Sequence, residues 1–168
     1  MSRRGHSRSV SVECYAKPMP LWPDIVVTRP DSPEVLLAVE AKAVVADVKS
    51  AEAQLKAYMV HMSCPVGMLV TWEQTRFYRN RYTDYEPQTV AMIGACATSE
   101  LLGPVPLPPS LADSYLERLV EDWLECLRAD ARRLWPSSAR EAIESSVLPV
   151  VIGGIVRAAG PRWRRTGS

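Results

Sequence analysis

Residues 35–43 read VLLAVEAKA, an apolar run in which Glu40 and Lys42 are the charged positions. A run of this kind is typical of a strand inside a sheet. Because side chains alternate along a strand, Glu40 and Lys42 project from one face of the sheet, while Val39 and Ala41 project from the other. Charges buried without partners are costly, so this pair must meet water, a counter-charge, a metal or a substrate. Taken alone, the two residues are most simply interpreted as a structural ion pair at the rim of a sheet.

The segments around this strand predict more strands and several helices. The period of the apolar residues becomes helical over 47–62 and again over 111–135, where Ser110 is a suitable N-cap. A shorter helix is expected over 137–146, and a last strand or a buried loop over 147–156. The other predicted strands cover residues 9–17, 24–28, 66–72, 75–79 and 88–97.

The predicted fold class is therefore α/β, a mixed sheet flanked by helices. We expect a core over 9–102 and a helical C-terminal extension over 103–160, which packs on the core or forms an interface. The extension begins at the Pro-rich connector GPVPLPPS. The Arg-rich segments 1–8 and 161–168 are interpreted as basic tails, which suit phosphate binding or are simply solvated. A length of 168 residues suits one domain.

Composition points to a cytoplasmic protein. The four cysteines are scattered and only two histidines accompany them, so a zinc site is not expected and the thiols are interpreted as reduced. The polar N-terminal stretch is unlike a secretory signal, and the most apolar late stretch is too short to span a bilayer. The net charge of +1 gives no indication for or against a polyanionic partner.

A second carboxylate changes the interpretation of Glu40 and Lys42. Asp24 begins the strand that precedes residues 35–43, and consecutive strands are usually neighbours, so Asp24 is expected close to Glu40. Two carboxylates at one spot suit Mg²⁺ or Mn²⁺, and the backbone carbonyl of Ala41 is a further candidate ligand. Lys42 is then expected to orient or help deprotonate an attacking water and to offset charge in the transition state.

The helix predicted over 47–62 adds two polar candidates. Gln54 and Tyr58 are four residues apart, so they share a helix face. We expect them to flank the apolar stripe and to face the strand ends. There the amide and the hydroxyl are able to support a phosphate site.

In this order, PD at 23–24, EAK at 40–42 and QLKAY at 54–58 resemble the P-D…(D/E)-x-K nuclease superfamily. The resemblance is to its RecB-like and type I restriction-subunit branches, which carry a Q-x-x-x-Y helix. The hairpin GMLVTWEQTRFYR also resembles the strand pair that follows this helix in the type I restriction nuclease domain. The resemblance covers residues 14–79, and its motifs are short.

This resemblance implies a restriction-endonuclease-like core and a Mg²⁺- or Mn²⁺-dependent endonuclease that hydrolyses phosphodiester bonds in DNA, in a family associated with defence against foreign DNA. Asp24 and Glu40 would be the metal ligands and Lys42 the catalytic lysine. Gln54 and Tyr58 would be supporting active-site residues.

Several alternatives stay open. Family members usually begin with a helix that contributes another acid, for which Glu13 is the available substitute, and the helicase portion of restriction subunits is missing. The chain is then a stand-alone nuclease-like domain, a partner-dependent subunit or a fragment. The alternative function is that of a catalytically inactive nuclease-fold protein that serves in nucleic-acid binding or assembly, and RNA is an alternative substrate. The helix over 111–135 is expected either to form a homodimer or partner interface through Trp123 or to cover its own sheet.

Overall fold

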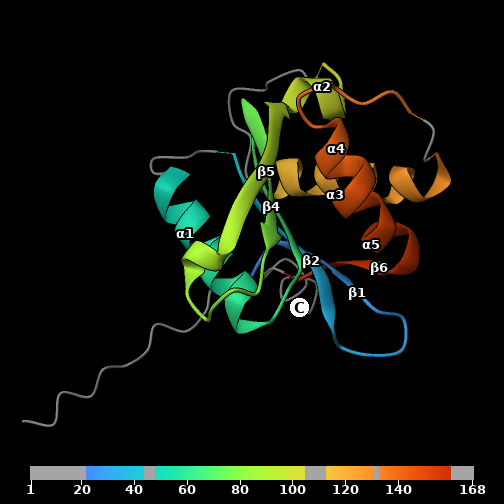
Figure 1. Ribbon diagram of the computed structural model, residues 1–168. Helices are drawn as coiled ribbons and strands as arrows, with labels where there is room; N and C mark the ends of the chain where they lie inside the picture. The colour runs from blue at the N-terminus through green and yellow to red at the C-terminus, as the bar shows by residue number, and fades with distance from the viewer. Residues whose placement is uncertain (1–21, 44–47, 105–112, 131–132, 160–168) are drawn as a thin grey trace, which may run out of the picture.

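A six-stranded mixed sheet runs through the middle of the molecule (Figure 1). The computed structural model describes residues 22–43, 48–104, 113–130 and 133–159. The strand order is β5-β4-β3-β2-β1-β6; β2 and β3 are parallel, and every other neighbouring pair is antiparallel. The strands are β1 (Ile25–Thr28), β2 (Val35–Lys42), β3 (Val66–Thr71), β4 (Gln74–Asn80), β5 (Val90–Ala97) and β6 (Ile155–Ala158).

Helices cover both faces of this sheet (Figure 1). Helix α1 (Val48–His61) lies on one face and connects the parallel strands β2 and β3. The other face is covered by helix α3 (Asp113–Ala129) and by a second helical segment. This segment consists of α4 (Arg140–Ala142), a π-helical turn (Ile143–Val147) and α5 (Leu148–Gly153). A 3-10 turn (Pro87–Thr89) precedes β5, and the short helix α2 (Thr98–Leu102) follows it.

The two faces explain the sequence of β2. Leu37, Val39 and Ala41 belong to the core beneath α3 and α5, whereas Ala38 belongs to the core beneath α1. A strand that is covered on both faces reads as a nearly continuous apolar run. Because side chains alternate along the strand, Glu40 and Lys42 lie on the same face of the sheet as Ala38, which is the face that α1 covers.

Most of the elements expected in the described residues are confirmed. The strands over 24–28, 35–43, 66–72, 75–79 and 88–97 correspond to β1 to β5, and the helix over 47–62 corresponds to α1. The predicted hairpin is the antiparallel pair β3–β4. The strand expected over 9–17, both basic tails and most of the Pro-rich connector lie outside the described residues.

The C-terminal helices differ from the expectation in two places. Helix α3 ends at Ala129 rather than at Trp135, because Trp135 folds back into the core and contacts Trp123 edge-to-face at 6.2 Å between ring centroids. Leu134, which lies within the range predicted for that helix, is 89% exposed. Residues 147–156 form the end of a helical segment and then β6, and Pro149 lies just after the π-helical turn of that segment.

The apolar face of α3 is used within the chain. Its buried residues pack in the same core as β1, β2 and β3, and Trp123 is 5% exposed. This helix therefore covers its own sheet, which was one of the two expected arrangements. Within the part of the chain that the structure describes, every helix is too short or too polar to cross a bilayer.

Candidate active site

Asp24 and Glu40 meet at one end of the β1–β2 pair. Ile25 lies opposite Val39 in the antiparallel register, and the N–H of Asp24 donates to the carbonyl of Val39 at 2.9 Å. Asp24 is thus placed beside Glu40, near the carboxyl end of β2, where the chain leaves the sheet toward α1. The carboxyl ends of parallel strands are a common place for ligand binding in α/β proteins.

Lys42 joins the two carboxylates. Its Nζ lies 2.7 Å from Oε1 of Glu40 and 3.5 Å from Oδ2 of Asp24. The same Oδ2 accepts a hydrogen bond of 2.8 Å from the N–H of Ala41, which fixes the Asp24 carboxylate against β2. Both acids are buried, with 7% and 4% of their surfaces exposed, whereas 30% of the Lys42 side chain is exposed. The lysine is therefore the member of the cluster that reaches solvent.

The charges of this cluster are not balanced. Burial raises the pKa of Glu40, the negative charge of Asp24 adds to that rise, and the hydrogen bond and charge of Lys42 offset it only in part. Burial alone would lower the pKa of Lys42, but the bond to Glu40 and the charge of Asp24 raise it above its ordinary value. Lys42 therefore carries a positive charge at neutral pH, and one cation faces more than one acid.

A third acid, Asp113, approaches the cluster from α3, and the sequence analysis missed it. Its Oδ1 accepts a hydrogen bond of 2.7 Å from the N–H of Ala43, directly after β2. Its charge further raises the pKa values of Glu40 and Lys42. Two residues later, Tyr115 stacks on Trp72 at 6.2 Å between ring centroids, so the start of α3 is tied to the hairpin as well. An acid at a helix start was the available signal, but its position depends on how α3 packs.

Within the described residues, neither Gln54 nor Tyr58 forms a hydrogen bond with Asp24 or Glu40. Gln54 is exposed on α1. Tyr58 does not flank the apolar stripe, as expected, but belongs to it: the residue is 3% exposed and lies in the core between α1 and the sheet. Its ring borders Val35 at the opposite end of β2, five residues from Glu40. The helix face was assigned wrongly because Leu55, Tyr58 and Met59 together make the buried side.

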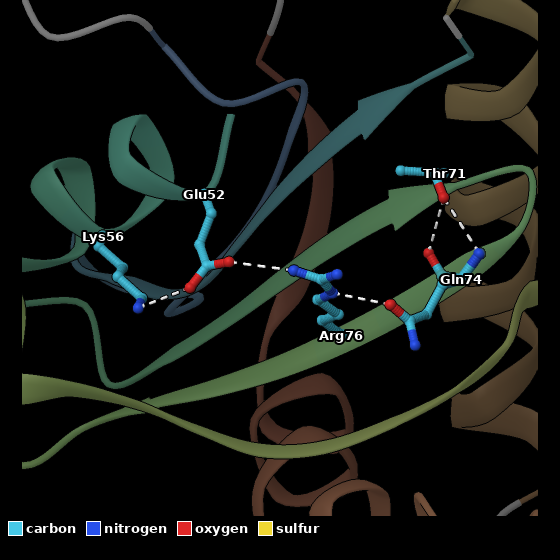
Figure 2. A network of polar contacts seen from close by, with 5 residues as sticks. All are labelled: Glu52, Lys56, Thr71, Gln74 and Arg76. Atoms are coloured by element: carbon cyan, nitrogen blue, oxygen red, sulfur yellow. Dashed lines mark hydrogen bonds and ion pairs between the residues drawn. The ribbon is translucent and has the colours of Figure 1, made fainter. Parts of the chain in front are cut away.

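A polar network extends over the α1 face of the sheet beside the cluster. Figure 2 shows Glu52 of α1 between Lys56 and Arg76, with Oε–N distances of 2.7 and 3.1 Å. The Nε of Arg76 also donates to Oε1 of Gln74 at 2.8 Å. Arg76 lies opposite Leu69, which lies opposite Glu40, so about 10 Å of sheet separates the arginine from the acids. The network fixes α1 against β4 with its charges paired.

The acids of the cluster fit a divalent cation of the Mg²⁺ type. Such ions are usually held by one or two carboxylates together with waters and phosphate oxygens, and a cation would relieve the repulsion that raises the pKa of Glu40. The carbonyl of Ala41 stays a predicted ligand, since the contact of this residue with Asp24 uses its N–H. Among the described residues, no group of three or more His, Cys, Asp or Glu side chains is arranged to hold a metal ion. Glu13 lies outside those residues.

Comparison with known proteins identifies no relative for this arrangement: the chain matches no family model, no curated protein and no solved structure.

Proposed function

We propose that this protein is a metal-dependent nuclease with a restriction-endonuclease-like core, which hydrolyses phosphodiester bonds in DNA with Mg²⁺ or Mn²⁺. The observation that carries the proposal is the cluster of Asp24, Glu40 and Lys42. The buried carboxylates of Asp24 and Glu40 each have an oxygen within 3.5 Å of the Nζ of Lys42, whose side chain is partly exposed. The three residues meet at the carboxyl end of the central strand β2. A structural ion pair alone would need one acid, and a second buried acid beside it adds repulsion that the lysine does not cancel.

Each residue has a distinct part in the proposed reaction. A bound divalent cation would polarise the scissile phosphate. Asp24 and Glu40 would hold this cation, and the Ala41 N–H keeps the Asp24 carboxylate in place. Lys42 retains its proton at neutral pH, so it stabilises negative charge in the transition state and orients water rather than serving as the base. Asp113 supports the end of β2 through its bond to Ala43.

The proposal is tested by nicking of a supercoiled plasmid in Mn²⁺ or Mg²⁺. We expect Lys42→Ala to lower the nicking rate by about 100-fold or more, because removal of one preorganised stabilising group usually has that effect. The matched control is Lys56→Ala. Lys56 is a half-buried lysine whose Nζ also lies 2.7 Å from a glutamate, but its partner is Glu52, and its loss should change the rate less than twofold.

Two results would contradict the proposal. One is an equal rate for both lysine variants, which would assign the cleavage to a contaminant or to another site. The other is a lack of metal-dependent nicking by the folded wild-type protein on duplex and single-stranded DNA and on RNA. That result would favour a catalytically inactive nuclease-fold protein with a role in nucleic-acid binding or assembly.

A homodimer or an assembly with a partner subunit stays a prediction.

A further inference from the structure

A pocket of about 510 Å³ lies along β1, between β6 and α1. Its walls include Val26 and Thr28 of β1, Tyr58 and Met62 at the end of α1, and Arg157 of β6, and Trp22 stands at its side. This volume lies within the range of small-ligand sites in proteins. The acid cluster does not contribute to these walls, and the polar network of Glu52 and Arg76 lies elsewhere on the sheet.

The buried hydroxyl of Tyr58 has no hydrogen-bond partner among the described residues. The residue is 3% exposed and lines the pocket. Burial raises the pKa of Tyr58 to about 12, so the hydroxyl keeps its proton at neutral pH and is able to donate. Buried polar groups in native proteins are nearly always hydrogen-bonded, so an orphaned donor in a pocket wall indicates a ligand with an acceptor.

Two further side chains give this pocket the character of a nucleotide site. Trp22 is 65% exposed, which is unusual for so large an apolar ring and leaves its face available for stacking. Arg157 lies opposite Val26 in the β1–β6 register, and it forms no ion pair with any acid in the described residues. An aromatic face, a hydroxyl donor and a cation are the groups that hold an unstacked base and its phosphate.

The pocket runs along the face of β1 that also carries Asp24. Asp24, Val26 and Thr28 alternate along one face of β1, so Val26 in the pocket wall lies about 7 Å from Asp24 along the strand. A nucleic-acid strand whose phosphate meets the acids is therefore able to place a neighbouring base in the pocket. A base within a continuous duplex stack would have to leave the stack first.

We propose that this pocket binds one unpaired base of a DNA strand, beside the phosphate held at Asp24 and Glu40, so that the substrate is DNA with an unpaired nucleotide at the cleavage position. The inference rests on the proposed nuclease function for the position of the phosphate. Trp22 stacks on the base, the Tyr58 hydroxyl donates to it, and Arg157 contacts the adjoining phosphate.

The test measures binding without cleavage. Fluorescein-labelled dT12 is titrated in EDTA with the wild-type protein and with Trp22→Ala, Tyr58→Phe and Tyr85→Ala, and binding is read by anisotropy. Trp22→Ala should weaken binding by between about fivefold and a hundredfold, the range for stacking on one aromatic side chain. Tyr58→Phe should weaken binding without lowering Tm, because the deleted hydroxyl has no hydrogen-bond partner among the described residues. Tyr85 is 94% exposed and outside the pocket, so its variant should bind like the wild type.

The base itself is tested with an abasic 12-mer of the same backbone charge, which should bind the wild-type protein at least fivefold more weakly than dT12. Equal binding of the two oligomers, or wild-type affinity in both pocket variants, overturns the pocket assignment whether or not the protein nicks plasmids. If the pocket variants bind dT12 weakly and no metal supports nicking, the pocket assignment stands and the nuclease proposal fails.

Discussion

At the scale of single residues, the pKa values of Glu40 and Glu52, both on the α1 side of the sheet, are shifted in opposite directions. Burial and the charge of Asp24 raise the pKa of Glu40. Burial also acts to raise the pKa of Glu52, but the hydrogen bond and charge of Lys56 and the charge of Arg76 lower it overall. Ionised Glu40 therefore destabilises the folded state, whereas ionised Glu52 stabilises it.

This contrast predicts stability changes of opposite sign. Glu40 favours the folded state fully below the ordinary glutamate pKa of about 4.3, and that contribution is lost as pH rises through its raised folded pKa. Glu40→Gln should thus raise Tm at pH 7, with a difference that disappears below about pH 4. The contribution of Glu52 is present above about pH 4.3 and is lost as pH falls through its lowered folded pKa, so Glu52→Gln should lower Tm at pH 7. Thermal unfolding between pH 3.5 and 8 distinguishes the two, and shifts of the same sign would contradict this electrostatic picture.

The residues that could be predicted are those whose positions follow from local rules. Alternation along β2 and the pairing of consecutive strands bring Asp24, Glu40 and Lys42 together, and the structure shows the same convergence. Asp113 follows from no local rule, because 70 residues separate it from its partner Ala43. Tyr58 was misplaced because its sequence does not show which side of α1 meets the sheet.

At the scale of elements, the junction between α5 and β6 depends on a close approach at Gly154. A methyl group there would meet Cγ1 of Val27 at 2.4 Å and the carbonyl oxygen of Val150 at 2.7 Å. Backbone atoms cannot move aside cheaply, so Gly154→Ala should destabilise the protein by about 1–3 kcal/mol. The neighbouring Gly153 has open space, so Gly153→Ala should be neutral or slightly stabilising. Urea unfolding measures both, and equal midpoints would disprove the close approach.

Element types were predictable where a period was clear, and element ends were not. The strands and α1 follow from apolar periodicity. The end of α3 does not, because Trp135 leaves the helical pattern to pack on Trp123, and this contact forms only in the folded core. Helix α2 was missed because it has only five residues. In its first turn, the Glu100 carboxylate accepts a hydrogen bond of 3.0 Å from the N–H of Ala97.

At the scale of the whole molecule, the proposed metal site should couple ion binding to stability. A ligand at 100 times its Kd that binds only the folded state adds about 2.7 kcal/mol, which for a chain of this length raises Tm by roughly 5–10 °C. We expect Mn²⁺ to produce such a rise, EDTA to reverse it, and Asp24→Asn to abolish it. The same titration of Glu52→Gln should retain the full rise. A rise of equal size in Asp24→Asn would place the ion elsewhere.

The last described strand, β6, pairs with the first described strand, β1, and the N–H of Ala159 donates to the carbonyl of Asp24 at 2.9 Å. During synthesis on the ribosome, a nascent chain that has emerged as far as β5 already contains Asp24, Glu40 and Lys42, but the edge of β1 is still open. The helices beneath the sheet are also incomplete at that stage. We therefore expect the backbone at Asp24 to be paired on both sides only when residues near 155–159 have left the exit tunnel. If the proposed nuclease function holds, this order would keep the incomplete chain inactive while it is still attached to the translating ribosome and its messenger RNA.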